Sequence, residues 1–380
     1  MSAARRVAHA VVVRALAEGA YVDRALRAAA EDLEPRDRAL AKQLAFGATQ
    51  RRGTLDWVIA NATAARGGQA PKLEPRVRAA LQLGLFELLF LSTADHAAVS
   101  EAVDLAKPSP GHKLVNAVLR RVQREGVELP SDETPAGAAI RHSHPRWLVD
   151  MWWEELGAEE TRALLAANNE PAELAVRQGL QAVVVDRIDE ARFAAGEITP
   201  MSRAAQLVAP RLDPQPGERV LDLCAAPGGK TAHIAALMQD TGEVVAVERH
   251  AGRARELAAS LQRQHVTCVE VVVADGKDFT DPDGFDRVLI DPPCSGLGTL
   301  RGHPDLRWQM TPDRIPKLVE EQDALLAAGR AALREGGTLV YSTCTISKRE
   351  ERLADPDAIR TLPHRDGTDG FYIARACPRR

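Results

Sequence analysis

The chain has 380 residues, of which 45% are hydrophobic and 4% aromatic, and its formal net charge is −4. This length allows two or three compact domains with aliphatic cores. The five cysteines include no C-x-x-C pair, so neither a disulfide framework nor a cysteine-based metal cluster is indicated. No apolar run approaches the roughly 20 residues that cross a bilayer, and His9 and Arg14 interrupt the N-terminal apolar stretch. We therefore expect a cytoplasmic, monomeric protein with no metal and no membrane contact.

Positive charge is concentrated in the first third of the chain. Residues 1–130 carry 19 Lys and Arg against 14 Asp and Glu, whereas the remainder carries 30 against 39. A basic front part on an acidic body can contact phosphates. The same excess, spread over many helices, also fits an ordinary solvated surface.

The first 130 residues follow the period of amphipathic helices. Apolar residues recur at i, i+3, i+4 and i+7 in segments such as "RRVAHAVVVRALAEGA", "RDRALAKQLAFGATQ" and "GHKLVNAVLRRVQREG". Gly and Pro lie between these segments, which predicts an all-α bundle over 1–130. The stretch "VELPSDETPAG" is typical of a linker. Residues 131–200 are predicted to combine this linker with a small α+β module whose short strands are "LAVRQG" and "AVVVDRI".

From residue 201 onward, short β-branched runs alternate with helical segments. The runs are "RVLDLC", "EVVAVE", "CVEVVVAD", "FDRVLIDP" and "GTLVYSTC", and the helical segments include "IPKLVEEQDALLAAGRAALREG". This order predicts a mostly parallel, doubly wound α/β sheet of Rossmann-like type over 201–380. Such sheets bind ligands beyond the carboxyl ends of their strands. The polar residues that end these runs are therefore the candidates for a functional site.

The first run ends in "LDLCAAPGGKT", which departs from two nucleotide-binding patterns. Cys224 stands where GxxxxGK[ST] requires glycine, and G-x-G-x-x-G is absent, which argues against a kinase or a nucleotide-dependent oxidoreductase. The acidic Asp222 and a small Gly-rich turn instead suit a cofactor with a cationic amino group and a carboxylate, held at a helix N-terminus. The predicted cofactor loop consists of Cys224, Ala225, Ala226, Pro227, Gly228, Gly229 and Lys230.

Two further acidic residues end the second and third runs. Glu248 is placed to accept hydrogen bonds from ribose hydroxyls, and Asp275 could bind an adenine amino group. Each acid alone could also be a turn or a helix cap. Because three acids end three successive strands next to a Gly-rich loop, the sequence favours S-adenosylmethionine as the cofactor.

The fourth and fifth runs are each followed by a cysteine. Cys294 follows Asp291 in "DPPCSG", where enzymes that methylate an amino nitrogen typically carry an aromatic residue, and Cys344 lies in "YSTCT". C5 of cytosine becomes nucleophilic only after a thiolate adds at C6, and a proton must later leave C5. Such chemistry needs a nucleophilic sulfur, a group near C5 and a carboxyl beside the ring. Cys344, Cys294 and Asp291 supply these three types of group.

Two alternative interpretations apply to these residues. A cysteine can also be a small, buried hydrophobic residue without a chemical role. We keep this interpretation for Cys268 and Cys377, and it is the alternative for Cys294 and Cys344. Lys230 could lower a thiol pKa or contact the substrate, or be an ordinary solvated lysine.

Together, "LDLCAAPGGKT", "VLIDPPCSGLGTLRGHPDLRW" and "GTLVYSTCTIS" resemble the RNA (cytosine-5) methyltransferases with Pro-Cys and Thr-Cys motifs. The front part resembles the NusB-type RNA-binding helical domain, and the combination is similar to the bacterial 16S rRNA enzymes of the RsmB type. The resemblance implies that Cys344 is the nucleophile and that Cys294 assists product release. It also implies that residues 224–230, Glu248, Asp275 and Asp291 line the cofactor site, that the helical domain helps to dock 16S rRNA, and that residues 131–200 include an RNA-recognition module.

The sequence departs from this family pattern in two places. After "STCTIS" the family usually continues Glu-Asn-Glu, whereas this chain has "KREER", and the last helix and strand are expected to be abbreviated. The segment "MSRAAQLVA" lacks an acidic residue beside Gln206. The same chemistry on tRNA or 23S rRNA, or a non-catalytic role in RNA binding or ribosome assembly, are the alternatives that the sequence leaves open.

Overall fold

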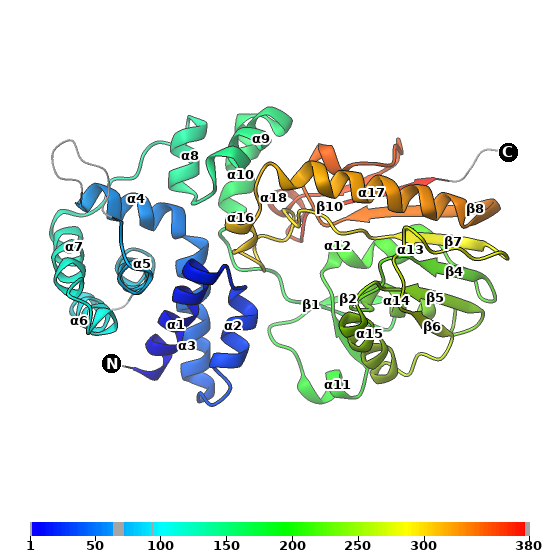
Figure 1. Cartoon of the computed structure of the whole chain (residues 1–380), viewed down its shortest axis with the longest axis horizontal. Helices are drawn as coiled ribbons and strands as arrows, with labels where there is room; N and C mark the ends of the chain where they lie inside the picture. The colour runs from blue at the N-terminus through cyan, green and yellow to red at the C-terminus, as the bar shows by residue number, and fades with distance from the viewer. Residues whose placement is uncertain (1, 64–71, 93, 377–380) are drawn as a thin grey trace. The chain divides into compact units, whose positions relative to one another are not determined.

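The computed structural model describes residues 2–63, 72–92 and 94–376, so Cys377 lies outside the described residues. The chain divides into two compact units (Figure 1). The helical unit comprises Met1–Asn169 and His303–Gln309, and the α/β unit comprises Glu170–Gly302 and Met310–Arg380. The predicted all-α front part followed by an α/β sheet is confirmed, whereas the predicted boundaries after residues 130 and 200 stay predictions.

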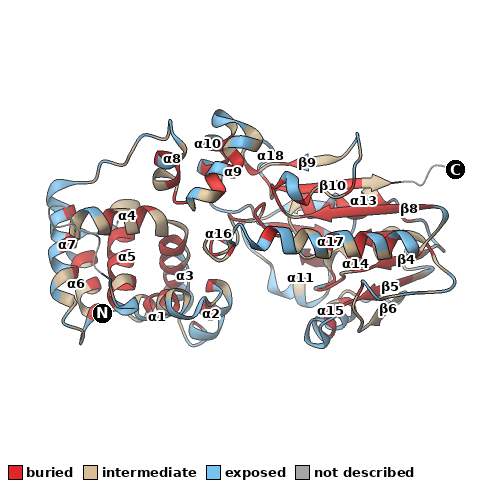
Figure 2. Ribbon diagram, turned by 45° about the horizontal axis from the view of Figure 1, so that its top comes forward, coloured by how far each residue is buried: buried red, intermediate tan, exposed pale blue. Residues whose placement is uncertain are grey.

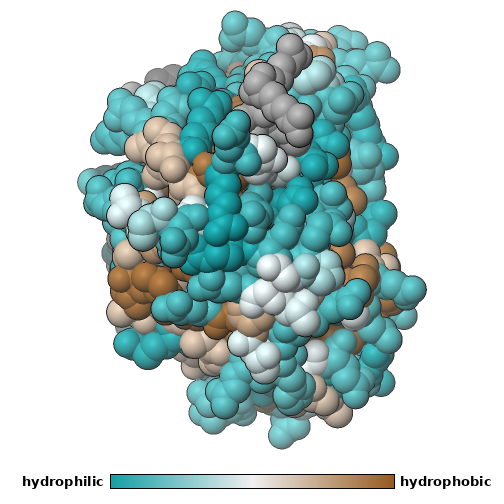
Figure 3. Space-filling view, turned by 90° about the vertical axis from the view of Figure 1, so that its right-hand side faces the viewer, coloured by the Kyte–Doolittle hydropathy of each residue, from teal (hydrophilic) through white to brown (hydrophobic). Residues whose placement is uncertain are grey.

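Two absences can be stated for the described residues. None of their helices is both long and apolar enough to cross a membrane. They also contain no group of three or more His, Cys, Asp or Glu side chains that could hold a metal ion. The face of the molecule in Figure 3 is mainly hydrophilic, with apolar side chains in small separate groups.

The helical unit is built from helices with clear start and stop signals. Ser2 caps the first helix by accepting a hydrogen bond from the Arg5 N–H, and Gly19 ends that helix with a positive φ. Proline opens three of the helices, at a position where its missing N–H costs nothing. The helices are α1 (Ala3–Glu18), α2 (Val22–Ala29), α3 (Pro35–Gln50), α4 (Arg52–Thr63), α5 (Pro75–Phe90), α6 (Asp95–Ala106), α7 (His112–Glu125), α8 (Pro135–Arg141), α9 (Arg146–Leu156), α10 (Ala158–Ala167) and α16 (Leu306–Gln309).

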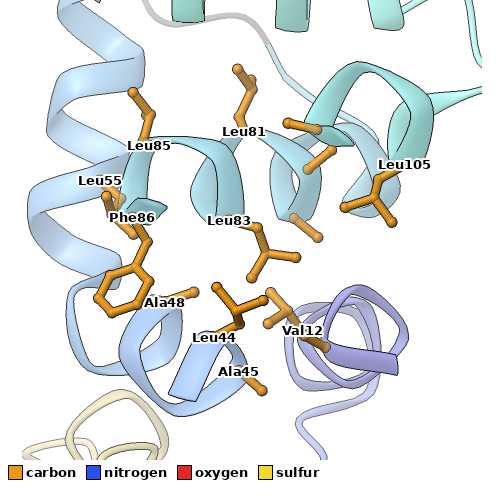
Figure 4. Close-up of a cluster of buried hydrophobic side chains, with 14 of the residues drawn as sticks. Val12, Leu44, Ala45, Ala48, Leu55, Leu81, Leu83, Leu85, Phe86 and Leu105 are labelled. Carbon is orange, nitrogen blue, oxygen red and sulfur yellow. The ribbon is translucent and has the colours of Figure 1, made fainter. Parts of the chain in front are cut away.

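Helix α5 forms the centre of the helical core. Its leucines Leu81, Leu83 and Leu85 are fully or almost fully buried, and they face side chains from α1, α3, α4 and α6 (Figure 4). The Phe86 ring lies so close to Gly47 on α3 that a Cβ at position 47 would overlap it. The two helices therefore approach closely only because residue 47 is glycine.

The segment His303–Gln309 follows the "DPPCSG" motif in the sequence but packs in the helical unit. Its residue Arg307 is fully buried. One guanidinium nitrogen donates to the Ser143 carbonyl at 3.0 Å and to Asn169 Oδ1 at 3.1 Å, and the other donates to the Asn168 carbonyl at 3.0 Å. Burial lowers the pKa of Arg307 to about 9. The planar guanidinium thus ties the segment to several backbone groups of the helical unit.

Replacement of Arg307 by methionine is expected to destabilise the helical unit. The methionine keeps much of the volume but leaves the carbonyl groups of Ser143 and Asn168 without these donors, at a cost of about 3 kcal/mol in the free energy of unfolding. Urea unfolding followed by far-UV circular dichroism measures this loss. Arg36→Met, which changes an exposed arginine of α3, is the matched control. Equal stability of the two variants would contradict the anchoring role.

The α/β unit contains two sheets. The smaller has the antiparallel order β2-β1-β3, and the larger has the order β6-β5-β4-β7-β8-β10-β9. From β6 to β8 the larger sheet is parallel, and β10 and β9 extend it antiparallel. In the described residues the last strand, β10, has six residues, and the helix before it, α18, has four. The strands are β1 (Ala175–Gln178), β2 (Gln181–Val184), β3 (Ile198–Pro200), β4 (Arg219–Asp222), β5 (Glu243–Val247), β6 (Val269–Val272), β7 (Phe285–Ile290), β8 (Leu333–Thr343), β9 (Ile359–Thr361) and β10 (Phe371–Ala376).

Helices cover both faces of the larger sheet (Figures 1 and 2). Along β4, Val220 packs with α13 and α14, whereas Leu221 packs on the opposite face with α17. The helix predicted over 315–336 ends earlier, at Ala331, because Leu333 already pairs with β7. The helices are α11 (Glu190–Ala194), α12 (Arg203–Gln206), α13 (Val208–Leu212), α14 (Gly229–Leu237), α15 (Ala251–Arg263), α17 (Arg314–Ala331) and α18 (Pro363–Asp366), with the short 3-10 helix η1 (Lys348–Glu350).

Candidate active site at the carboxyl ends of the parallel strands

The strand order reverses at the centre of the larger sheet. After β4 the chain adds β5 and β6 on one side, and β7 then pairs with β4 on the other side. At such a point the loops that leave the two central strands diverge and open a crevice. The loop after β4 carries residues 224–230, and the loop after β7 carries Asp291 and Cys294.

A cavity of about 270 Å³ lies at these strand ends. Seven of the residues predicted from the sequence line it: Cys224, Ala226, Glu248, Asp275, Asp291, Cys294 and Cys344. Its wall does not include Asp222, Ala225, Pro227, Gly228, Gly229 or Lys230, although they belong to the same strand ends and loops. Sequence analysis missed the remaining lining residues, which are Leu223, Arg249, Arg253, Gly276, Pro292, Pro293, Glu321 and Leu325.

Asp222 is a buried carboxylate with one unused oxygen. Its Oδ2 accepts a hydrogen bond from Thr231 Oγ1 at 2.8 Å, whereas Oδ1 has no hydrogen-bond partner among the described residues. Burial raises the pKa of Asp222 to about 6. In the following loop, Gly228 has a φ of +99°, and a Cβ there would lie 2.7 Å from the Leu257 side chain. The turn into α14 therefore requires glycine at this position.

Glu248 and Asp275 end the neighbouring strands with different degrees of burial. Glu248 is almost fully buried, and its Oε1 accepts a hydrogen bond from the His250 N–H at 2.8 Å. Its Oε2 lies 3.4 Å from Nη1 of Arg253. Asp275 is partly exposed, and the hydrogen bond from the Lys277 N–H holds the pKa of Asp275 below its ordinary value. Asp275 can therefore accept hydrogen bonds in ionised form.

Asp291, the first residue after β7, forms an ion pair with Lys230. Lys230 Nζ donates to its Oδ2 at 2.6 Å, and Ser342 Oγ donates to its Oδ1 at 2.7 Å. Burial lowers the pKa of Lys230, but the charges of Asp291 and of a Cys344 thiolate raise it, and the net pKa lies above the ordinary value. Lys230 is thus a fixed cation within electrostatic range of Cys344. Sequence analysis missed Ser342, although it precedes Thr343 and Cys344 on the same strand end.

The sulfur atoms of Cys294 and Cys344 lie 3.4 Å apart. The hydrogen bond between the two thiols, together with burial and the charges of Glu350 and Asp291, raises the pKa of Cys294 well above its ordinary value. Cys294 therefore remains a thiol at neutral pH. Cys268, in contrast, lies away from this cavity and packs against a hydrophobic cluster.

Comparison with known proteins finds one family match in each of the two units. Residues 209–355 match the family described as 16S rRNA methyltransferase RsmB/F, and residues 2–124 match the NusB family. The chain is 34% identical to the probable ribosomal RNA small subunit methyltransferase B of Synechocystis sp., over 93% of each chain. It is also 34% identical to the ribosomal RNA small subunit methyltransferase B of Vibrio cholerae, over 94% of this chain and 93% of that one.

The chain belongs to the RsmB/F family of methyltransferases. Its fold also matches the crystal structure of PH0851, with a TM-score of 0.80 at 24% identity over 99% of this chain and 98% of that one. A methyltransferase homolog from Pyrococcus horikoshii matches with a TM-score of 0.56 at 24% identity, over 63% of this chain and 97% of that one. The predicted fold and S-adenosylmethionine-dependent methylation are confirmed.

The cavity of this RsmB/F methyltransferase fits S-adenosylmethionine. The unused Oδ1 of Asp222 can accept a hydrogen bond from the cationic amino group of the cofactor. Glu248 and Asp275 can accept from ribose hydroxyls and an adenine amino group, and the start of α14 offers N–H groups to a carboxylate. The individual roles of these residues stay proposals.

Asp222→Asn is expected to stabilise the RsmB/F fold while weakening cofactor binding. The ordinary carboxyl pKa is 3.8 and the native value is about 6, so the cost of the buried charge appears as the pH rises through this range and is complete above it. The variant should gain up to about 3 kcal/mol of unfolding free energy at pH 8 and roughly half of that at pH 5. S-adenosylmethionine affinity should fall about 100-fold, as measured by titration calorimetry.

Asp240→Asn serves as the control with the opposite sign. Burial raises the pKa of Asp240, but hydrogen bonds from Thr267 and Cys268 lower it to about 2. This variant should lose stability at pH 8 and keep its cofactor affinity. If Asp222→Asn destabilised the protein at pH 8, the proposed free-energy cost of the buried Asp222 charge would be wrong.

Proposed function

We propose that the protein methylates C5 of a cytosine in 16S rRNA, with Cys344 as the nucleophile and Cys294 as the residue that assists release. The observation that carries this proposal is the pair of sulfur atoms 3.4 Å apart, in the wall of a cavity that also contains Glu248 and Asp275. S-adenosylmethionine, when bound, supplies an electrophilic methyl group. The protein would act in the cytoplasm and as a monomer, and its oligomeric state stays a prediction.

The charges around the two thiols favour Cys344 as the nucleophile. The ammonium group of Lys230 interacts favourably with a Cys344 thiolate, and a neighbouring cation stabilises the reactive thiolate form. Addition of this sulfur to C6 of the cytosine breaks the C5–C6 double bond and makes C5 an enamine carbon. Asp291, which is held by Lys230 and Ser342, lines the same cavity. Its carboxyl group can bind a ring nitrogen of the cytosine.

Cys294 suits the second half of the reaction. Once C5 carries the methyl group, its proton must leave so that the C5–C6 double bond re-forms and the Cys344 sulfur departs. Cys294 can accept this proton only as a thiolate, so it must first release its own proton to water, and its high pKa then makes that thiolate a strong base. We propose that Cys294 takes part in this proton transfer.

Paired cysteine variants test the proposal. Cys344→Ala should abolish methyl transfer to RNA, because it removes the sulfur proposed to add to C6, and should change S-adenosylmethionine affinity less than twofold. Cys294→Ala should accumulate a covalent protein–RNA adduct, because the step that releases Cys344 slows. Labelled methyl transfer and denaturing gel electrophoresis measure the two outcomes.

Cys268→Ala is the matched control, since this thiol lies outside the cavity; both readouts should match the wild type. Normal methylation by Cys344→Ala would overturn the nucleophile assignment. A wild-type protein that transfers no methyl group to any RNA would favour the non-catalytic alternative. Bisulfite sequencing of 16S, 23S and transfer RNA from cells with and without the protein distinguishes the substrate classes.

We propose that RNA docks on a basic groove of the helical unit between α2 and α3. This groove has a volume of about 780 Å³ and includes Arg24, Arg27 and Lys42, all exposed. The Lys42 ammonium lies 5.7 Å from the centre of the Phe46 ring, and aromatic rings can stack on unpaired bases. Exposed cations beside an accessible ring combine phosphate attraction with a stacking surface.

The double variant Arg27→Ala, Lys42→Ala is expected to weaken RNA binding and its dependence on salt. Loss of two phosphate contacts should reduce the slope of log K against log salt by about 1.4. Filter binding at several salt concentrations measures this slope. The control Lys107→Ala, Arg124→Ala removes the same charge from exposed positions at the carboxyl ends of α6 and α7. Equal slopes for both double variants would place the RNA elsewhere.

A further inference from the structure

Glu350 is a fully buried carboxylate in the segment that departs from the family pattern. It is the last residue of η1 and has no exposed surface. Removal of a carboxylate from water is costly unless charged or polar groups replace the lost hydration. The partners of Glu350 therefore indicate why the charge is retained at this position.

One oxygen of Glu350 holds the loop that carries Cys294. Oε1 accepts a hydrogen bond from the Ser295 N–H at 2.8 Å and another from Gln322 Nε2 at 3.1 Å. Gln322 on α17 also donates to the Pro293 carbonyl at 3.0 Å. The residues on both sides of Cys294 are thus bonded to the same carboxylate–amide pair.

The other oxygen of Glu350 reaches both cysteine loops. Oε2 accepts from Ser295 Oγ at 2.5 Å and from Thr345 Oγ1 at 3.1 Å, and the two hydroxyl oxygens lie 2.6 Å apart. Ser295 directly follows Cys294, and Thr345 directly follows Cys344. One carboxylate therefore bonds to the residue after each thiol.

We infer that Glu350 is a positioning residue that sets the distance between the two catalytic sulfur atoms. The inference rests on the proposed cytosine-5 chemistry, because only that reaction requires both sulfurs at one ring. Glu350 acts through the N–H and hydroxyl groups of Ser295 and the hydroxyl group of Thr345. Without it, the Cys294 loop loses a charge-assisted bond to its backbone N–H and its link to the Cys344 loop.

The step that depends on Cys294 is the one that this loss slows most. Addition by Cys344 needs only one sulfur near C6. The Lys230–Asp291 ion pair does not involve Glu350 and remains when Glu350 is replaced. Release needs Cys294 near C5 while Cys344 is bonded to C6, so it depends on the spacing of the two loops. A small misplacement of a reacting group can cost about 100-fold in rate.

Glu350→Ala tests the inference in the full-length protein with S-adenosylmethionine and the RNA substrate. We expect kcat to fall about 100-fold, KM for S-adenosylmethionine to change less than twofold, and the fraction of protein trapped as covalent RNA adduct to rise during turnover. Glu350→Gln keeps the shape and can still accept from the Ser295 N–H, so it should recover part of kcat. Ser295→Ala removes the two hydroxyl bonds to Glu350 and Thr345 but keeps the backbone N–H bond, and it should give a smaller rise in adduct.

Glu351→Ala is the matched control, because this neighbouring carboxylate bonds to Arg360 instead of the cysteine loops; kcat and adduct should stay within twofold of the wild type. A folded Glu350→Ala protein with normal kcat, or with a loss of kcat but no extra adduct, overturns the inference. If Glu350→Ala does not fold, the Ser295→Ala result decides by the same adduct criterion. If the Cys294→Ala protein also forms no adduct, the cytosine-5 chemistry itself fails, which distinguishes the two failures.

Discussion

The parallel pairing of β7 with β4 on one side and β8 on the other brings the functional groups together. The register places Asp222 beside Leu289 and Ile290 beside Tyr341. The next residue after β7, Asp291, consequently meets Ser342 and the loop that carries Cys344. A shift of one residue would turn every side chain of β7 to the opposite face of the sheet. The site therefore depends on the same backbone pairing that buries the core.

The acidic side chains of this site differ in how far protein groups satisfy their charge. Asp222 keeps a raised pKa and an unused oxygen, an arrangement that costs free energy until a cationic donor binds. Asp291 and Glu350 are instead fully hydrogen-bonded by protein groups. The unused oxygen of Asp222 is thus available to a ligand, whereas every oxygen of Asp291 and Glu350 already has a protein partner. The free-energy cost of the Asp222 charge agrees with the general trade-off between stability and activity at functional sites.

Sequence patterns were sufficient for the strands and for the residues at their ends, because β-branched runs that stop at Asp, Glu or Cys show both the element and its boundary. They were insufficient for Arg307 and Glu350. Both lie in short charged segments that resemble solvated loops, and their partners are distant in the chain: Asn168 is 139 residues from Arg307, and Ser295 is 55 residues from Glu350. Burial of a single polar side chain leaves no periodic signal, so only the folded structure reveals such contacts.

The two cysteines look equivalent in the sequence, since each follows a strand and each is surrounded by small residues. In the structure they share one contact but have different electrostatic environments. The hydrogen bond with Cys344, burial and the charges of Glu350 and Asp291 raise the pKa of Cys294, whereas Lys230 offers a positive charge to Cys344. A thiol with a raised pKa is a strong base once it has released its proton, and a thiolate near a cation suits addition to carbon. The placement of three charged side chains thus supports the different roles proposed for the two cysteines.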